Sequence, residues 1–465
     1  MTISKEQLIN IGAENLADII ISIYQNNKDM HKQIDIILAG AVGDPKKIIS
    51  MIKKEIAALK KGTRFIDYYE SNHFADRLDK LRLHIANDLM LASPVYSAEL
   101  MINFINLHES ILNRVDDSNG EISSVFVLAC SDLGKIYQHI SYKTEEAIDL
   151  VFSWFMSNKF GVLDDIIQDF KSVLKLDGLE ILQNKIENSL NDKNAMTVTR
   201  GLKEIADCKK DVDAFIRACS FTSKPCAHDH LEIAKRLIDA WRSEEALNWL
   251  ASMELASDHS WHQDRIKLKI QALELSGEYQ EAQNERIAWF EKSLSSEIYG
   301  QILSNAKDEF KEDFRKKSIA KAFDYFHPSA SLSFLKDIQE FNEVAKFVLR
   351  KIDELNGDQY YTLRPVADLL REIDPLAATL VYRKLIEPIL EKAKSKYYNY
   401  AAKDLLTCKI LSTKIIDWQN FQDHESYQEL VEEKNKRKLA FWGEYKSAIQ
   451  KQEAKQLAKK DKDDK

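Results

Sequence analysis

Two short stretches that align with each other decide the fold class: Arg242-Ser-Glu-Glu-Ala246-Leu and Gly277-Glu-Tyr-Gln-Glu-Ala282-Gln. Ala246 and Ala282 lie 36 residues apart. That spacing is close to the period of roughly 34 residues in tetratricopeptide units, where a small residue lets two paired helices approach closely. Because the match is degenerate, it predicts irregular helix pairs rather than a consensus array.

Apolar residues on both sides of this pair recur at helical spacing. Asp44-Pro45 predicts a helix start, because the N–H group that proline lacks has no partner inside the helix at the first position. An apolar stripe follows and Gly62 predicts the helix end. The stripe consists of Ile48, Ile52, Ile56 and Leu59. Three more proline starts are Ser93-Pro94, His327-Pro328 and Asp374-Pro375. The apolar periodicity of the whole chain predicts roughly twenty helices and no strand.

The composition favours the same class. Gly contributes 13 and Pro 7 of the 465 residues, about 4% against an average near 12%. Folds rich in turns, such as β-sandwiches and doubly wound α/β folds, need more of both residues. Hydrophobic residues at 45% exclude a fully disordered chain.

We therefore predict an all-α fold, an irregular α-solenoid of antiparallel helix pairs that is tetratricopeptide-like in its carboxy-terminal half. The stretch from Ser220 to His230, with Pro225 and small polar residues, is the best candidate hinge. The predicted organisation is an amino-terminal helical array at 1–221, a tetratricopeptide-like array at 222–445 and a charged tail at 446–465. The tail is almost free of apolar residues, which predicts a frayed helix or disorder.

Charge and cysteine usage favour a cytoplasmic protein without a membrane segment. The net charge of −8 offers no general attraction to phosphate backbones or anionic lipid. Five scattered cysteines suit a reducing compartment better than a disulfide framework. The first 27 residues lack a basic leader region, and Glu6, Glu14 and Asp18 interrupt their apolar residues, so neither a signal peptide nor a membrane span is expected.

One cluster has the residue types of a zinc site. Its members are Cys219, Cys226, His228, His230, His259 and His262. Thiolates and imidazoles are preferred zinc ligands. The spacing is unlike that of known sites because there is no Cys-x₂-Cys pair, so buried thiols and hinge histidines are the favoured reading. We assign no catalytic, cofactor-binding or metal-binding residue from the sequence.

The acidic turn at 116–121, Asp-Asp-Ser-Asn-Gly-Glu, resembles a calcium loop only superficially. With Gly120 in the sixth place, the first and twelfth ligand positions fall on Val115 and Phe126, which cannot bind calcium. A turn between two helices, with a minor recognition role left open, explains the same residues. Phosphate-binding glycine loops and hydrolase motifs are missing from the sequence.

Two further groups of residues leave alternatives open. Trp241, Trp249, Trp261 and Trp289 surround the repeat pair, either as buried anchors, which their type favours, or as the lining of a peptide groove. Residues 434–460 hold nine Lys or Arg against two Glu, a net charge of +7. Such a segment can bind nucleic acid or an acidic partner, but a solvated terminal helix with Phe441 and Trp442 docked inward is favoured.

Several segments resemble those of known families. Residues 63–68 (Thr-Arg-Phe-Ile-Asp-Tyr), 114–120 (Arg-Val-Asp-Asp-Ser-Asn-Gly) and 129–134 (Ala-Cys-Ser-Asp-Leu-Gly) resemble blocks of an uncharacterised bacterial family of helical proteins, a domain of unknown function. The stretches 380–383 and 397–405, and 436–438 before Phe441, are similar to the helical end of bacterial SWIM zinc-finger proteins. The chain has neither the Cys-x-Cys pair nor the Cys-x-His of that finger, so the resemblance implies no zinc site. Neither resemblance implies a reaction.

The favoured function is a scaffold that binds a protein or peptide, because stacked helix pairs create extended surfaces. The alternatives are a metal-dependent enzyme or metalloprotein built around Cys219–His262 and nucleic-acid binding through the basic carboxy terminus. Enzyme activity and nucleic-acid binding are both disfavoured, and no cofactor is expected.

Overall fold

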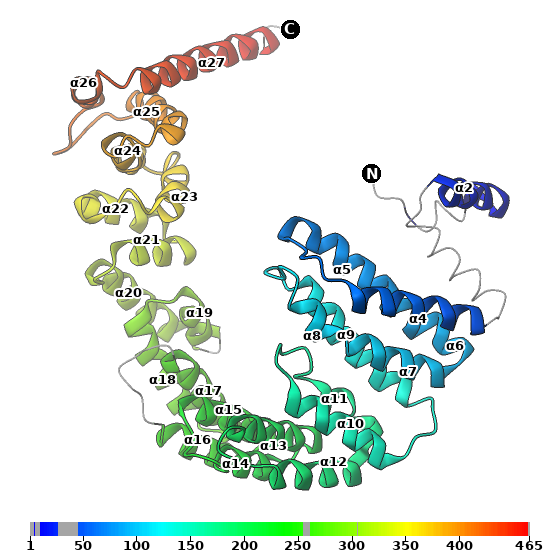
Figure 1. The fold of residues 1–465 in the computed structure, drawn as a ribbon. Coiled ribbons are helices and arrows are strands. Elements are labelled where there is room, and N and C mark those ends of the chain that lie inside the picture. The colour runs from blue at the N-terminus through cyan, green and yellow to red at the C-terminus, as the bar shows by residue number, and fades with distance from the viewer. Residues whose placement is uncertain (1–3, 5–9, 27–44, 254–260, 305, 464–465) are drawn as a thin grey trace. The chain divides into compact units, whose positions relative to one another are not determined.

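The computed structural model describes residues 4, 10–26, 45–253, 261–304 and 306–463, and it is built of helices (Figure 1). Among these residues the β-structure is limited to one isolated bridge, between Ile66 and Val115. The all-α prediction is thereby confirmed.

The helices up to residue 261 are α2 Ala13–Asn26, α4 Pro45–Lys61, α5 Tyr68–Leu83, the π-helix η1 His84–Leu89, α6 Met90–Ala92, α7 Pro94–Ile105, α8 His108–Leu112, α9 Glu121–Tyr137, α10 Thr144–Ser157, α11 Ile166–Asp169, α12 Lys171–Asn188, α13 Ala195–Lys209, α14 Val212–Cys219, α15 Ala227–Asp239 and α16 Ser243–Ala251. The helices after it are α17 His262–Leu275, α18 Tyr279–Ser293, α19 Ser296–Ser304, α20 Asp308–Asp324, α21 Pro328–Asp337, α22 Phe341–Lys351, the 3₁₀-helix η3 Ile352–Glu354, α23 Tyr360–Leu370, α24 Pro375–Glu391, the 3₁₀-helix η4 Ser395–Tyr397, α25 Tyr398–Ser412, α26 His424–Asn435 and α27 Leu439–Asp463.

The chain forms two compact units, Met1–Trp261 and His262–Lys465. The boundary predicted from the sequence, at 221/222, is forty residues earlier and lies inside the first unit. Ion pairs across the predicted hinge explain the difference: Lys203 of α13 pairs with Asp229 of α15, and Arg236 of α15 contacts Asp207 of α13 at 2.6 Å. The hinge residues therefore form a loop within one packed unit.

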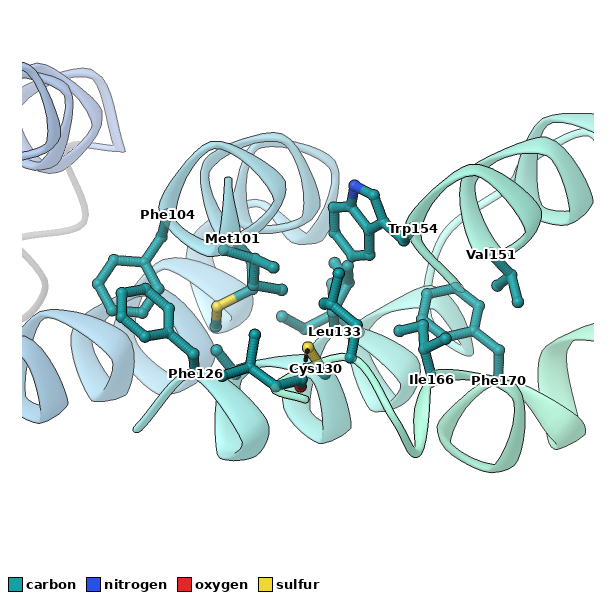
Figure 2. Close-up of a cluster of buried hydrophobic side chains, with 14 of the residues drawn as sticks. Met101, Phe104, Phe126, Cys130, Leu133, Val151, Trp154, Ile166 and Phe170 are labelled. Carbon is teal, nitrogen blue, oxygen red and sulfur yellow. Dashed lines mark hydrogen bonds between the residues drawn. The ribbon is translucent and has the colours of Figure 1, made fainter. Parts of the chain in front are cut away.

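The core of the first unit is continuous from α4 to α14. Figure 2 shows its middle, where side chains of α7, α9, α10 and α11 meet. The rings of Phe104 and Phe126 stack at 5.2 Å, and the apolar stripe predicted for α4 is buried. Gly134 lets α9 approach the next segment, since a Cβ there would lie 2.4 Å from the carbonyl oxygen of Asp169.

Two of the three segments that carry the family resemblance meet in this unit. The Ile66 N–H donates to the Arg114 carbonyl at 3.0 Å, and the Asp116 N–H donates to the Ile66 carbonyl at 2.9 Å. The Arg114 guanidinium donates to the carbonyls of Arg64 and Leu59 at 3.2 and 3.3 Å. Arg114 thereby ties the end of α4 to the loop before α9.

Five joints in the described chain share one backbone geometry. Each has a residue in the left-handed region, and the N–H of the following residue donates to the carbonyl five positions earlier, at 2.8–3.0 Å. The left-handed residues are Lys210, Trp241, Gly277, Gln339 and Ala393. They join α13 to α14, α15 to α16, α17 to α18, α21 to α22 and α24 to α25. This joint ends one helix and turns the chain sharply into the next.

The second unit has its own core, from α18 to α27. Pro328 and Pro375 begin α21 and α24 as predicted, and Asp374 caps α24 through its side chain. Gly357 allows the loop before α23 to pass against α24, because a Cβ there would lie 1.9 Å from the Lys384 carbonyl oxygen. Ala246 of α16 and Ala282 of α18 are both fully buried, each within its own unit.

The carboxy-terminal helix α27 runs to Asp463, so the predicted tail continues as helix. No helix in the described part of the chain combines the length and apolar character needed to cross a membrane.

Candidate functional site

Five exposed aromatic side chains lie at the beginnings of three helices in the second unit. We call them the aromatic edge: Phe326, Tyr360, Tyr361, Tyr397 and Tyr400. Phe326 and Tyr361 are 72% and 80% exposed, and the other three are about half exposed. Seven aromatic residues of the described second unit are exposed, and five of them belong to this group, with Tyr279 and Phe310 as the other two. Exposed aromatic residues of this unit therefore gather at these helix starts.

Contacts link the three segments that carry these residues. The Ser329 hydroxyl at the start of α21 donates to the Gln359 side chain, immediately before Tyr360 in α23. The Tyr360 and Tyr361 rings lie 4.0 Å apart between centroids. The hydrogen bond to Tyr361 raises the pKa of Tyr360, and Tyr397 lies close enough to raise it further.

The third segment belongs to α25, which follows α23 and α24 along the second unit (Figure 1). The centroids of Tyr397 and Tyr400 are 6.4 Å apart, and the Lys403 ammonium lies 5.9 Å from the Tyr400 ring centre. The aromatic edge therefore spans three helix starts.

The aromatic edge is locally basic. Lys392, Lys394, Lys396 and Lys403 surround its α25 end. Asp358 pairs with Lys392 and, at 2.9 Å, with Lys394, and these two contacts hold the pKa of Asp358 below its usual value. Four lysines and Arg364 outnumber the three carboxylates of these segments, Asp358, Glu391 and Asp404, which leaves an excess of positive charge at this end.

A buried ion pair fixes the spacing of the two helices that carry the tyrosines. Arg364 of α23 donates to both carboxylate oxygens of Asp404 in α25, at 2.8 and 2.6 Å. Asp404 is only 2% exposed, so the guanidinium replaces the water that burial removes. Each partner lies one helical turn after exposed tyrosines, Tyr361 and Tyr400.

A second buried arginine organises the end of this unit. Arg383 of α24 donates to the carbonyls of Gln422 and Asp423 at 2.7 and 3.1 Å, and it lies between the rings of Trp418 and Tyr427. The adjacent His424 is buried. Burial and the charge of Arg383 lower its pKa to about 4, so the imidazole is neutral at physiological pH.

The Cys and His residues of the predicted zinc alternative have separate roles. Cys219 is buried, and desolvation raises its pKa to about 11, so the thiol stays protonated. Cys226 caps α15, with its N–H donating to Asp229 at 2.8 Å. His228 and His230 lie against Trp261 and Trp249.

The remaining two candidates do not complete such a site. His259 lies outside the described residues, and His262 begins the second unit. Within residues 45–253 and the other described ranges, no three His, Cys, Asp or Glu side chains are arranged to hold a metal ion.

The acidic turn at 116–121 is a turn between helices. Gly120 has φ of 73°, and the Asp117 carboxylate accepts from the N–H groups of Ile122 and Ser123 at 2.8 and 2.9 Å. Asp116 accepts from the Ser118 N–H and hydroxyl. Asp117 thus caps the first turn of α9, and Asp116 stabilises the turn before it.

Two of the four tryptophans are not the buried anchors that their type favours, whereas Trp289 packs against the core of the second unit. Trp241 is 81% exposed because it occupies a left-handed joint, and Trp261 is 39% exposed. Trp249 and Trp289 are half-buried. Trp289 lines a shallow pocket of 130 Å³ with His262 and Lys269 in the second unit.

The aromatic residues of the basic carboxy terminus point inward. Phe441 is fully buried against Tyr398, and the Trp442 indole N–H donates to the Asn435 carbonyl at 3.0 Å. They are therefore not exposed for stacking on nucleic-acid bases, and the basic residues of this segment lack an aromatic platform.

A separate acidic cluster lies in the first unit. Glu204 of α13 is largely buried beside Asp164, Asp165 and Asp207, and Arg200 is its nearest cation at 3.8 Å. Burial is the main cause that raises the pKa of Glu204, Arg200 opposes it and the three aspartates add to it, so that the pKa is about 8. Glu204 is therefore mostly protonated at pH 7.

The structure defines an all-helical protein made of repeated helix joints with an exposed aromatic edge. The chain belongs to a family of unknown function, DUF6880, whose model matches residues 1–200 and 187–444. No curated protein matches the chain. Among solved structures, a circular tandem repeat protein with novel repeat topology and enhanced subunit contact surfaces is similar at 13% identity and a TM-score of 0.20, with 96% of this chain and 100% of that chain covered.

Proposed function

We propose that this protein is a binding scaffold, an irregular α-solenoid with tetratricopeptide-like pairs, whose aromatic edge holds an extended acidic segment of a partner protein. The bacterial origin, the cytoplasmic location and the absence of catalysis expected from the sequence are part of this proposal. The resemblance of the carboxy-terminal helices to SWIM proteins stays a prediction.

The observation that carries the proposal is the continuity of exposed aromatic rings over three helix starts. Tyrosine supplies rigid, amphipathic contact area at low entropic cost and is enriched at protein interfaces. The five residues come from three segments, 326, 360–361 and 397–400, that are more than thirty residues apart in sequence. Residues from such distant segments come together only because the helices that carry them pack side by side.

The chemistry of the partner follows from spacing and charge. Packed helices lie roughly 8–10 Å apart, and one turn of a polyproline II helix advances about 9 Å. Prolines one turn apart can therefore meet rings on successive helices, as in other aromatic-lined grooves. The lysines around Tyr397 and Tyr400 favour acidic residues between the prolines.

A fluorescein-labelled peptide of repeating Pro-Pro-Glu tests the proposal on the full chain by fluorescence anisotropy. We expect saturable binding that weakens with salt, and at least about tenfold weaker binding when Tyr361 and Tyr400 are both replaced by alanine. Tyr69→Ala is the matched control, because Tyr69 is a 92% exposed tyrosine in the first unit.

Two outcomes contradict the proposal. One is equal binding of the peptide by the native chain and the double variant. The other is equal binding of a Pro-Pro-Lys peptide, which would remove the argument from charge.

A further inference from the structure

A groove in the first unit has an apolar floor and a lysine rim. It measures 720 Å³ and lies between α4 and the junction of α6 and α7. Ile49, Ala57, Ala92 and Tyr96 form its apolar surface. Lys53 lies on the rim, 3.1 Å from Glu99 and 5.8 Å from the Tyr96 ring centre.

The apolar surface extends beyond the groove. Leu91 and Val95, the sequence neighbours of groove residues, are 90% and 63% exposed. The helix that forms the opposite wall is strongly basic: α4 holds six lysines and one glutamate. An apolar, basic groove of this kind fits an amphipathic helix with acidic residues.

The same chain contains such a helix with no buried residue. In α2, Leu16, Ile19, Ile20, Ile23 and Tyr24 follow the spacing of a single helix face. Ile19, Ile20 and Ile23 are 39–46% exposed, and α2 as a whole buries no residue. Its charged residues are Glu14 and Asp18, without a lysine or arginine.

We propose that α2 docks through this isoleucine face into the groove between α4 and α7 of its own chain. Apolar contact removes the exposed isoleucines from water. Glu14 and Asp18 lie on the opposite face of α2 and give the docked helix a net negative charge, which favours its position beside the lysines of α4. Burying three isoleucine side chains is the larger contribution, since exposed ion pairs add little.

The connection between the two helices permits docking within one chain. Residues 27–44, eighteen in number, join α2 to α4, and a chain of that length spans at most roughly 60 Å. Because α2 and the groove belong to one chain, docking between them is intramolecular and does not depend on the protein concentration. A modest affinity is then sufficient for occupancy within the chain.

The test measures access to the groove in the full chain. Ser50 lines the groove and is exposed, so Ser50→Cys provides a thiol whose alkylation by a maleimide is followed by peptide mass spectrometry. We expect Ile20→Asp to accelerate alkylation at position 50 several-fold. Ile21→Asp is the matched control, because Ile21 is 53% exposed and lies off the isoleucine face.

The proposal is overturned if Ile20→Asp and Ile21→Asp give the same alkylation rate as the native α2. Dependence of the protection on protein concentration would also overturn it, in favour of α2 from a second copy. Circular dichroism of each variant checks that the helices of the rest of the chain are retained.

Discussion

Arg364 and Asp404 form a two-pronged ion pair that joins α23 to α25 inside the second unit. Because each partner follows exposed tyrosines by about one helical turn, the pair sets the distance between the two halves of the aromatic edge. The stability of this unit and the arrangement of the aromatic edge therefore depend on the same contact.

Replacing Asp404 by asparagine removes the charge that compensates Arg364. We expect the free energy of unfolding to fall by about 2–3 kcal/mol, as for hydrogen bonds to charged groups. A urea titration followed by circular dichroism measures the change. Asp358→Asn serves as the exposed control and should change stability far less, because its ion pairs are solvent-exposed. An equal loss at both positions would contradict the role of Asp404.

Glycine is required at Gly357 but not at Gly300. Gly357→Ala would place a Cβ 1.9 Å from the Lys384 carbonyl oxygen, whereas a Cβ at Gly300 meets nothing within 4 Å. We expect Gly357→Ala to destabilise the protein by about 2–3 kcal/mol and Gly300→Ala, inside α19, to stabilise it by up to about 1 kcal/mol. The opposite signs in thermal unfolding are the diagnostic result.

The left-handed joints give a second test of backbone conformation. Gln339 has φ of 62° and Gly277 has φ of 81°. We expect Gln339→Gly to raise the free energy of unfolding by up to about 1 kcal/mol and Gly277→Ala to lower it by about 1 kcal/mol. A Cβ at Gly277 meets nothing within 4 Å, so that loss reports on the backbone alone. Similar stability of Gly277→Ala and the native chain would contradict the left-handed geometry.

His424 should make stability depend on acidic pH. Its pKa is about 4 in the folded chain, below the ordinary value of 6.5, because it is buried beside Arg383. The unfolded state therefore binds the proton more readily, and stability falls as the pH drops from about 6.5 to 4. His424→Phe should flatten this part of the stability profile, and an unchanged slope would refute the burial of a neutral imidazole.

Glu204 should make stability depend on alkaline pH. Its pKa is raised to about 8, so the stability linked to its protonation is present below about 4.5 and is lost as the pH rises through 8. Glu204→Gln should therefore stabilise the protein more at pH 9 than at pH 5. The same substitution at the exposed Glu433 should show no such difference, and a parallel response of both variants would be evidence against the raised pKa.

The periodic residues of the sequence predict much of the fold. The stripe of α4, the proline starts of α21 and α24 and the burial of Ala246 and Ala282 all follow from local rules. Local rules do not predict the joints at Lys210, Gln339 and Ala393. These residues have no preference for the left-handed region, so the packing of the paired helices imposes that conformation. Trp241 is a further example. Its residue type predicts burial, but its position at a left-handed joint leaves the side chain exposed.

The sequence predicts the aromatic edge less well than it predicts the helices. Tyr360-Tyr361 and Tyr397 are visible in the sequence as aromatic residues beside predicted helix starts, which is a weak signal. Their meeting depends on contacts distant in sequence, such as Arg364 with Asp404 and Ser329 with Gln359. No local pattern encodes those pairings.

The repeated left-handed joint has a consequence for how such chains diversify. Each joint is closed by hydrogen bonds between residues within the same hairpin, so a whole hairpin can be inserted or deleted without breaking the joint of its neighbour. Lineages of this family can then gain or lose length in units of one helix pair. The number of hairpins, rather than the identity of single residues, becomes the variable that sets the length of the helical array.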